Sequence, residues 1–467
     1  MYKGGQRKLK TMLKRLLSVI NSIKPAQVMV IGFGALILLG GFMLNLPIAS
    51  KNGESIGFLN ALFTSTSAVC VTGLVVVDTG TYWSEFGQFI IITLIQTGGL
   101  GFMTIATMFS LLTRKKINLR ERLLIKESLN QGDLSGLVKL TRYIIMMTFV
   151  IEGIGALLLS IVYIPKLGLL RGIWYSIFHS ISAFCNAGFD LMGSISGEYS
   201  SLTYFVDNSL INFAICGLII LGGIGFPVLL DIINNKKYSK LNVHSKIVIN
   251  TSAILIAIGV FFIFIAEFNN SNTLGSLNMK EKLLSSIFQS VTLRTAGYNT
   301  IDLSLLGEST LFLMVILMLI GASPASTGGG LKTTTIATLF LTVKSFILGK
   351  EDIEVYQRRI SDATVKKSLG IFFIGVFIVL FGTLMLTIVN PEFTLLESVF
   401  EVISAYATVG LSIGGTPSLT ALGKVIIIML MFLGRVGSLT IFVALLSKST
   451  RAKSKIRYAE GKIIVGL

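Results

Sequence analysis

Four short segments of small residues, each containing a glycine, hold the groups best suited to do chemistry in this chain. They are Val71-Thr72-Gly73, Asn186-Ala187-Gly188, Thr295-Ala296-Gly297 and Thr408-Val409-Gly410. Their glycines lie 115, 109 and 113 residues apart, which indicates a repeated unit. Glycine reaches backbone angles that a side chain would forbid. Because rings of backbone carbonyls can replace the hydration shell of an ion, the four segments together predict a cation path.

The four segments differ in how closely they match a known ion filter. Thr408-Val409-Gly410 repeats part of the Thr-Val-Gly-Tyr-Gly filter of potassium channels, and Thr295-Ala296-Gly297-Tyr298 nearly does. The first two segments are degenerate. A single glycine in an apolar chain more often marks close packing between helices. Four in register favour the filter interpretation, whereas the glycine clusters of the helices that follow are as well explained by close helix contact.

The elements that position these segments must lie in a membrane, because the chain is 52% hydrophobic and only 13% charged. Eight stretches approach the length of about 20 apolar residues that one helical crossing needs. They are 28–46, 86–112, 143–164, 209–233, 247–267, 310–345, 369–389 and 423–446. A half-helix of about 14 residues reaches only about 20 Å and must turn back. The sequence predicts an all-α integral membrane fold with four tandem helix, pore loop, helix repeats arranged pseudo-fourfold around one ion pathway.

Charge divides the chain into a cytoplasmic side and an outer side. Of the 40 Lys and Arg residues, 31 lie at the two ends and in alternate connections, and six lie in the outer connections. By the positive-inside rule we expect a multi-pass plasma-membrane protein with both termini in the cytoplasm. The net charge of +17 then reflects orientation and contact with anionic membrane lipid, and no nucleic acid partner is expected. The predicted domains are a basic N-terminal segment 1–27, pore repeats 28–113, 142–234, 246–347 and 364–447, and a C-terminal tail 448–467.

The sixth apolar stretch is interrupted by polar and helix-breaking residues. Pro324 and the run Gly328, Gly329 and Gly330 interrupt a helix, and Lys332 is costly at membrane depth unless it faces water. We interpret residues 323–335 as an intramembrane gate beneath the filter, held loosely because few apolar side chains anchor it. The alternative is a kinked helix whose freed backbone groups are satisfied by neighbouring helices.

Arg435 is the other charge within an apolar stretch. Two interpretations stand side by side. Arg435 forms a barrier to cations below the filter, or it pairs with carbonyls at a helix end or with Glu152 or Glu401. Arg294, three residues before Gly297, is expected to brace the filter from behind.

The remaining residues that often carry chemistry do not form a site. His179 and His244 are isolated, and we expect them at the membrane interface and the cytoplasmic surface. The three cysteines lie in or beside apolar segments and predict neither a disulfide framework nor a metal site. No catalytic cluster and no phosphate-binding glycine loop is found, so an enzyme is not expected.

Taken together, the four segments, the Ser-Pro-Ala-Ser-Thr-Gly-Gly-Gly-Leu-Lys stretch and Arg435 resemble the Trk/Ktr/HKT superfamily of potassium transporters over residues 28–446. The Ktr-type pore subunit is most similar, because Trk-type members carry two further N-terminal helices. The resemblance implies potassium uptake, K⁺ as the transported ion and Na⁺ as a candidate regulator. It also implies a homodimer, with one pore in each chain, on a cytoplasmic ring of nucleotide-binding regulatory subunits. Sodium-selective plant members have Ser at the first filter glycine, so Gly73 favours potassium.

Two other functions remain open. One is a cation channel that works without a regulatory ring. The other is a secondary transporter with alternating access, in which broken helices mark a binding site near the membrane midplane. The fourfold period argues against alternating access, since the repeats of such transporters usually form two halves.

Overall fold

The computed structural model describes residues 25–101, 104, 123, 137–438 and 440–441. Four long helices form its framework: α2 (Pro25–Leu44), α8 (Leu137–Leu167), α13 (Val243–Glu267) and α17 (Asp362–Val389). Each is long and apolar enough to cross a membrane. Their large apolar side chains point outward; Leu157, Phe261 and Phe373 are 65–70% exposed, as lipid-facing residues are. The predicted C-terminal tail 448–467 and residues 1–24 of the predicted N-terminal segment lie outside the described residues.

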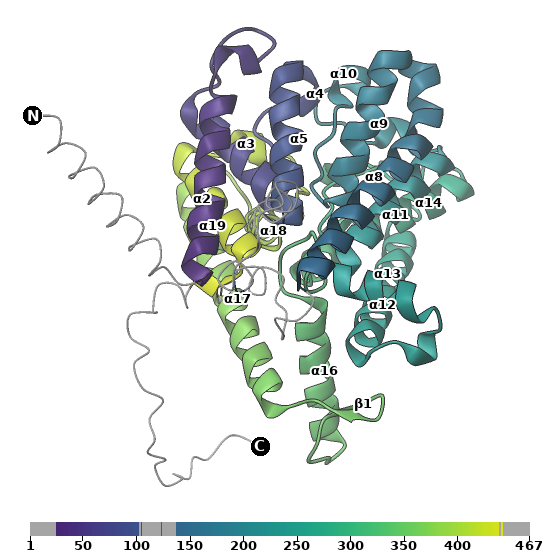
Figure 1. Cartoon of the computed structure of the whole chain (residues 1–467). Coiled ribbons are helices and arrows are strands. Elements are labelled where there is room, and N and C mark those ends of the chain that lie inside the picture. Colours follow the sequence, from purple (N-terminus) through teal and green to yellow (C-terminus); the bar gives the residue numbers. More distant parts are fainter. Residues whose placement is uncertain (1–24, 102–103, 105–122, 124–136, 439, 442–467) are drawn as a thin grey trace, which may run out of the picture.

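A shorter helix follows each long one and packs back against it (Figure 1). These pore helices are α3 (Phe58–Cys70), α9 (Leu169–Phe184), α14 (Met279–Thr292) and α18 (Leu395–Ala407). With 13 to 16 residues they span about 20–24 Å, too little to cross a hydrocarbon layer of about 30 Å. Two of them begin with a capping box, Asn278 with Glu281 and Thr394 with Glu397, which fixes where each helix starts.

One contact between long helix and pore helix recurs in the first three repeats. A serine hydroxyl of the pore helix donates to a carbonyl of the long helix at 2.6–2.7 Å: Ser65 to Ile37, Ser180 to Glu152 and Ser290 to Ile256. A glycine three residues after each accepting carbonyl leaves space for the hydroxyl: Gly40, Gly155 and Gly259. In the fourth repeat Val402 packs against Gly382 instead. The same joint at the same place indicates that the four hairpins are copies of one unit.

The third helix of each unit is shorter than the sequence suggested. These inner helices are α5 (Glu85–Leu100), α11 (Ser209–Ile224), α15 (Glu308–Leu319) and α19 (Ala421–Val436). We expected continuous helices over 86–112, 209–233 and 423–446, and this was wrong. Gly101, Gly225 and Gly437 end them with φ of 80°, 98° and 90°. At Gly225 the chain turns by 98° into α12 (Phe226–Asn235).

Only the break in the third inner helix was predicted. There, residues 320–332 separate α15 from α16 (Thr333–Ile347). At the other three breaks a second glycine, three residues earlier, lies against a pore helix. A Cβ at Gly98, Gly222 or Gly434 would lie 2.0, 1.9 and 1.8 Å from the carbonyl oxygens of Val69, Phe184 and Tyr406. Each of these three inner helices therefore has two glycines three residues apart, the first at the close contact with a pore helix and the second where the helix ends.

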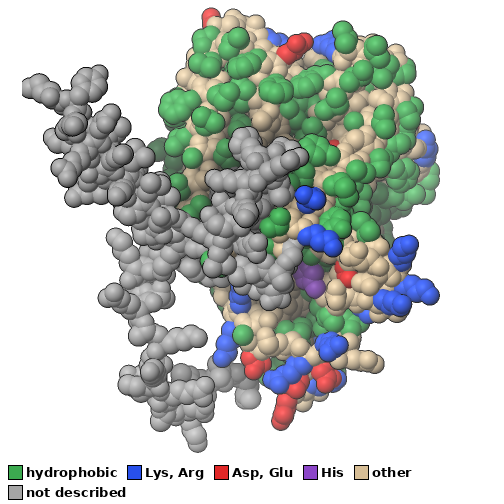
Figure 2. Space-filling view, viewed as in Figure 1, with side chains coloured by type: hydrophobic (Ala, Val, Ile, Leu, Met, Phe, Trp, Pro, Cys, Tyr) green, Lys and Arg blue, Asp and Glu red, His purple; other side chains and the backbone are tan. Residues whose placement is uncertain are grey.

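Short elements fill the connections. They are α4 (Thr79–Tyr82), α10 (Gly193–Ser196) and the 3₁₀ turns Pro47–Ala49, Thr203–Phe205, Tyr238–Lys240, Leu303–Leu305 and Thr416–Ser418. The strands β1 (Glu354–Val355) and β2 (Arg358–Arg359) pair antiparallel between α16 and α17, which project together beyond the rest of the molecule (Figure 1). Charged side chains gather at this end, while hydrophobic side chains cover most of the body (Figure 2). This distribution agrees with a membrane-embedded body and an end in water.

Gly222→Ala should destabilise the protein, because its Cβ would lie 1.9 Å from the Phe184 carbonyl oxygen and neither backbone can yield cheaply. Overpacking of this kind costs about 1–3 kcal/mol. The control is Gly217→Ala in the same helix, where no atom lies within 4 Å of the new carbon. Thermal unfolding of the detergent-purified variants should show a loss for Gly222→Ala only. Equal melting temperatures would mean that the two helices do not pack this closely.

Candidate functional site

The four predicted segments meet in one closed ring. Each glycine is packed against the next segment, so that an added Cβ would touch a neighbouring carbonyl oxygen. The contacts run from Gly73 to Ala187 (2.5 Å), Gly188 to Ala296 (2.7 Å), Gly297 to Val409 (2.8 Å) and Gly410 to Thr72 (1.9 Å). The order is that of the sequence and returns to its start. All twelve predicted filter residues therefore lie together, at positions contributed by four separate helical hairpins.

The backbone of the ring repeats one unusual conformation. The first residue of each segment is left-handed: Val71, Asn186, Thr295 and Thr408 have φ of 58°, 60°, 67° and 53°. The glycine two positions later is again at positive φ, from 71° to 97°, while the residue between them is not. Alternation of this kind turns successive peptide groups toward the same side of the chain. For a β-branched residue such as Val71 it is also strained, and such strain gathers at functional sites.

Hydroxyl groups of the pore helices brace the ring from behind. In the first and fourth repeats the amides of Gly73 and Gly410 donate to Ser67 Oγ and Ser404 Oγ, both at 3.1 Å. In the second and third repeats the hydroxyl donates instead to the carbonyl after the glycine, Ser182 to Phe189 at 2.7 Å and Thr292 to Tyr298 at 2.6 Å. Sequence reasoning missed these braces. The signal was a Ser or Thr five or six residues before each glycine.

The ring lies where negative potential collects. Four pore helices end directly before it, so the negative ends of their dipoles are adjacent to the segments. At the other end of the segments lies a cavity of about 800 Å³, which the four glycines help to line. Its described lining includes no Lys or Arg. It does include four carboxylates, those of Asp78, Asp190, Glu198 and Asp302. Both features favour a cation over an anion in the ring.

The predicted gate lies against the opposite end of the ring from the cavity. The amide of Gly329 donates to Thr408 Oγ1 at 3.0 Å, and Thr327 Oγ1 donates to Asn186 Oδ1 at 3.1 Å. A Cβ at Gly328 would lie 2.1 Å from Thr295 Oγ1. The loop between α15 and α16 thus contacts the first residue of three of the four segments. Gly330 follows on the same side, against Ala407.

This loop is held by more bonds than the sequence suggested. We expected few apolar contacts to hold this segment; its backbone is held by hydrogen bonds, in which the amides of Ser323 and Thr327 donate to the carbonyls of Gly223 (3.0 Å) and Gly222 (3.2 Å). The amide of Phe226, at the start of α12, donates to the loop carbonyl of Ala325 at 3.1 Å. Backbone hydrogen bonds, rather than contacts between apolar side chains, hold this loop in place. The loop and the break between α11 and α12 therefore form one hydrogen-bonded unit.

Three cationic side chains bind carbonyls around this loop. Lys332 Nζ donates to Gly328 at 2.7 Å and to Gly329 at 3.3 Å, within the loop itself. Arg435 donates to the carbonyl of Thr327 and to those of Gly98 and Gly99 at the end of α5. Arg294, behind the third segment, donates to Gly321 at 3.3 Å.

Of the alternatives left open for Arg435, the structure has the pairing with carbonyls at a helix end. In the described part of the chain its guanidinium has no ion pair with either candidate acid. Glu152 accepts from Gln96 Nε2 at 3.2 Å, and Glu401 accepts from the hydroxyls of Ser412 and Thr416. Carbonyl partners do not neutralise the positive charge of Arg435, which lies beside the loop, so the barrier interpretation is compatible with this pairing.

We expected His179 at the membrane interface, but its side chain lies in the interior of the protein. It is fully buried behind the second segment, where its Nδ1 lies 2.7 Å from the Tyr175 carbonyl and its Nε2 accepts from the amide of Leu191 at 3.2 Å. The rings of Tyr163 and Phe178 pack around it. The face of a short helix that turns inward could not be recognised from its few residues.

Comparison with known proteins agrees with this geometry. The family model TrkH, described as cation transport protein, matches residues 24–454. The chain is 43% identical to the potassium/sodium uptake protein NtpJ of Enterococcus hirae, over 96% of this chain and 98% of that protein. It is 42% identical to the Ktr system potassium uptake protein B of Bacillus subtilis, over 95% and 97%.

A solved structure shares the fold. The crystal structure of the potassium transporter TrkH from Vibrio parahaemolyticus superposes with a TM-score of 0.70 at 17% identity, and the match covers 91% of this chain and 85% of that one. This match confirms the predicted membrane fold, and the family model and the two relatives confirm the predicted superfamily, which groups the chain with ion transporters rather than enzymes. This chain belongs to the TrkH family of cation transport proteins.

Proposed function

We propose that this chain is the membrane subunit of a potassium uptake system and that K⁺ crosses through the ring of residues 71–73, 186–188, 295–297 and 408–410. The observation that carries the proposal is the closed cycle of four segments with alternating left-handed backbone. The choice of ion is supported by the name of one relative, a potassium uptake protein, and the name of a second includes both potassium and sodium uptake.

The physical argument starts from the cost of taking a cation out of water. An ion in the hydrocarbon layer must keep oxygen ligands around it, and the ring offers backbone carbonyls from four directions. The four pore-helix ends add a favourable potential. The acidic cavity at the outer mouth raises the local cation concentration. None of these groups has to move for a cation to enter.

The gate proposal rests on the loop of residues 320–332. Its contacts with three of the four segments leave it beside the inner end of the ring, and Arg435 and Lys332 put positive charge there. A cation leaving the ring toward the cytoplasm would meet both. We therefore propose that the loop is the gate, with Gly328, Gly329, Gly330, Lys332 and Arg435 as its main residues. Movement of the loop away from the ring would open the path.

The assembly is also proposed rather than observed. We propose a homodimer in the plasma membrane with both termini in the cytoplasm, regulated by a nucleotide-binding ring and contacting anionic lipid. Na⁺ remains a candidate regulator. The hairpin at β1 and β2 is the described surface best suited for docking a cytoplasmic partner, since it is exposed and carries charged side chains of both signs, such as Arg359 and Asp352 (2.8 Å apart).

The decisive experiment is ion flux into liposomes that contain the purified chain, with K⁺ and Na⁺ compared. We expect flux with K⁺ preferred. Full flux without any partner would instead indicate a self-sufficient cation channel. Slow, saturable exchange that needs solute on both sides would indicate alternating access. No preference for K⁺ would overturn the proposed selectivity.

Gly73→Ser should reduce the preference for K⁺ over Na⁺. Gly73 has φ of 97°, and its new Cβ would lie 2.5 Å from the Ala187 carbonyl oxygen, so the ring must distort. We expect the permeability ratio to fall at least about fivefold, equivalent to ~1 kcal/mol of discrimination. The matched control is Gly57→Ser at the start of the same pore helix, with φ of 85° and no atom within 4 Å. If both variants keep the wild-type ratio, the first segment is not part of the filter.

Arg435→Ala should raise K⁺ flux through the chain about tenfold, the effect of lowering a barrier by ~1.4 kcal/mol. The change removes a fixed charge beside the path and also frees the carbonyl of Thr327. Arg435→Lys separates the two causes, because it keeps the charge but not the planar donors. We expect the lysine variant to remain close to wild type. Poor expression of the alanine variant with no gain in flux would support a purely structural role.

Deletion of residues 327–331 should give high K⁺ flux in the chain alone, and this flux should not respond to a regulatory partner or its ligands. The deletion removes the bonds of Thr327 and Gly329 to the ring and both carbonyl partners of Lys332. The protein must first elute as a single species from size-exclusion chromatography. Low flux in a folded, inserted deletion variant would leave the kinked-helix interpretation in place.

A further inference from the structure

The boundary between the second and third segments of the ring differs from the other three. At its inner end, Asn186 Nδ2 donates to the carbonyl of Arg294 at 3.1 Å. At its outer end, the Tyr298 hydroxyl donates to the carbonyl of Phe189, also at 3.1 Å. Among the described residues no hydrogen bond joins adjacent segments at the other three boundaries. The second and third segments are thus tied together at both ends.

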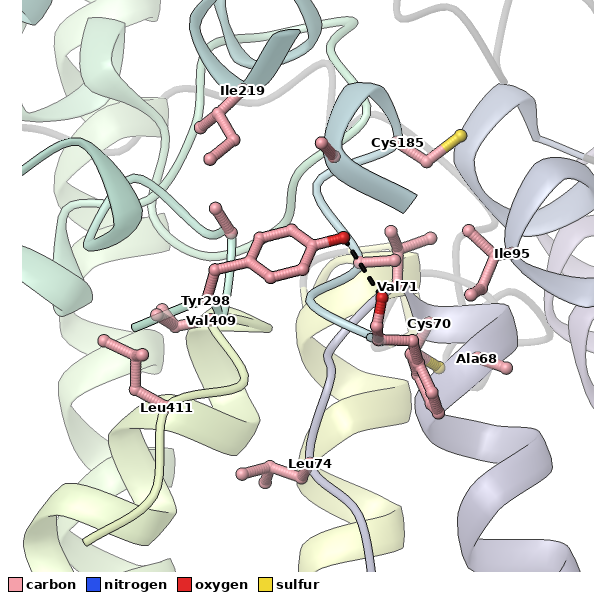
Figure 3. Packing of buried hydrophobic residues seen from close by; sticks show 14 of the residues in the cluster. Ala68, Cys70, Val71, Leu74, Ile95, Cys185, Ile219, Tyr298, Val409 and Leu411 are labelled. Atoms are coloured by element: carbon pink, nitrogen blue, oxygen red, sulfur yellow. Dashed lines mark hydrogen bonds between the residues drawn. The ribbon is translucent and has the colours of Figure 1, made fainter. Parts of the chain in front are cut away.

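Tyr298 is well placed to hold the outer tie. It follows Gly297 directly and is fully buried. Figure 3 shows its ring reaching across between the segments, with the hydroxyl directed at a carbonyl of the neighbouring one. Phe189, which supplies that carbonyl, stands at the same position after Gly188. The bond therefore joins equivalent points of two adjacent segments.

The Phe189 carbonyl has a second donor. Ser182 Oγ, from the pore helix behind the segment, donates to it at 2.7 Å. A carbonyl oxygen has two lone pairs, so these two donors together can satisfy it. Held in this way, the oxygen is turned toward the protein and away from a passing ion.

The hydroxyl of Tyr298 is not needed to fill space. The equivalent residues of the other segments are Leu74, Phe189 and Leu411, which are also buried and have no polar atom in the side chain. A buried hydroxyl without a partner is costly, so its presence here depends on the bond that it makes. Tyrosine differs from phenylalanine by one oxygen, and in Tyr298 that oxygen makes the hydrogen bond between the segments.

We propose that Tyr298 is a specificity-determining residue, which keeps the second and third segments at the spacing that suits K⁺. The inference rests on the proposed function of the ring. Na⁺ is smaller than K⁺, so its ligands must approach more closely before they replace its hydration shell. The hydrogen bond to Phe189 resists that approach, because it fixes the distance between the segments and the direction of the carbonyl. Without it the ring can contract around Na⁺.

The test is Tyr298→Phe, measured as the ratio of K⁺ to Na⁺ permeability in liposomes. The ring of the side chain remains and one oxygen is lost, so K⁺ flux should stay within about twofold of wild type. We expect the permeability ratio to fall about two- to tenfold, the range set by one neutral hydrogen bond. The matched control is Tyr175→Phe, whose hydroxyl lies 2.6 Å from Ser194 Oγ in the outer connection and touches no segment. It should keep the wild-type ratio.

A double-mutant cycle tests the carbonyl itself. Ser182→Ala removes the second donor, and its loss alone should also lower the ratio. Because one donor still holds the oxygen in each single variant, Tyr298→Phe with Ser182→Ala should lower the ratio more than the product of the two single effects. Should Tyr298→Phe not fold, Ser182→Ala must still lower the ratio if the inference is right.

The outcomes separate the two proposals. A wild-type chain without K⁺ preference would overturn both the filter and the role of Tyr298. A selective wild type with equal ratios in Tyr298→Phe and Tyr175→Phe would overturn only the role of Tyr298. A fall in K⁺ flux and melting temperature at an unchanged ratio would do the same, since it would reveal a purely structural bond.

Discussion

The constraint on which the structure depends is that irregular backbone inside a membrane must have its polar groups satisfied by protein or water. Four segments of the ring and the loop of residues 320–332 are such backbone. Many of their amides and carbonyls are bonded by hydroxyls of the pore helices, by the broken ends of the inner helices and by part-buried cations. Each of these partners is placed by a helix that can itself cross or enter the membrane. The backbone carbonyls of the ring are the groups that a dehydrated cation would need.

The two ends of the proposed pathway carry opposite electrostatic character. The outer end combines the carboxylates of the cavity with the negative ends of four pore helices. The inner end carries Arg435 and Lys332, whose partners in the described chain are carbonyls rather than carboxylates. A cation is therefore attracted into the ring and opposed on leaving it. Since both basic residues bind the loop, the same bonds that hold the loop also keep the opposing charge in place.

The four units of this fold repeat the same contacts between helices, although the residues that make these contacts differ in part. Ser65, Ser180 and Ser290 make the same bond to a long helix, yet the fourth repeat uses a valine. The third inner helix is interrupted by a loop where the others break at one glycine. Departures of this kind lie where the repeats carry different tasks. The tie between the second and third segments is another such departure, because the described residues show no hydrogen bond between adjacent segments at the other three boundaries.

The sequence by itself determined the number of units, the four glycine segments and the break in the sixth stretch. These are local signals, since hydropathy, proline and glycine act on the residues beside them. The family was recognisable for the same reason. Only the tertiary structure decided the cyclic contacts of the ring, the carbonyl partners of Arg435, the burial of His179 and the breaks at Gly101, Gly225 and Gly437. Each of these depends on contact between residues that lie far apart in the chain, such as Arg435 with Gly98, and no spacing within one segment records where the other partner will fold.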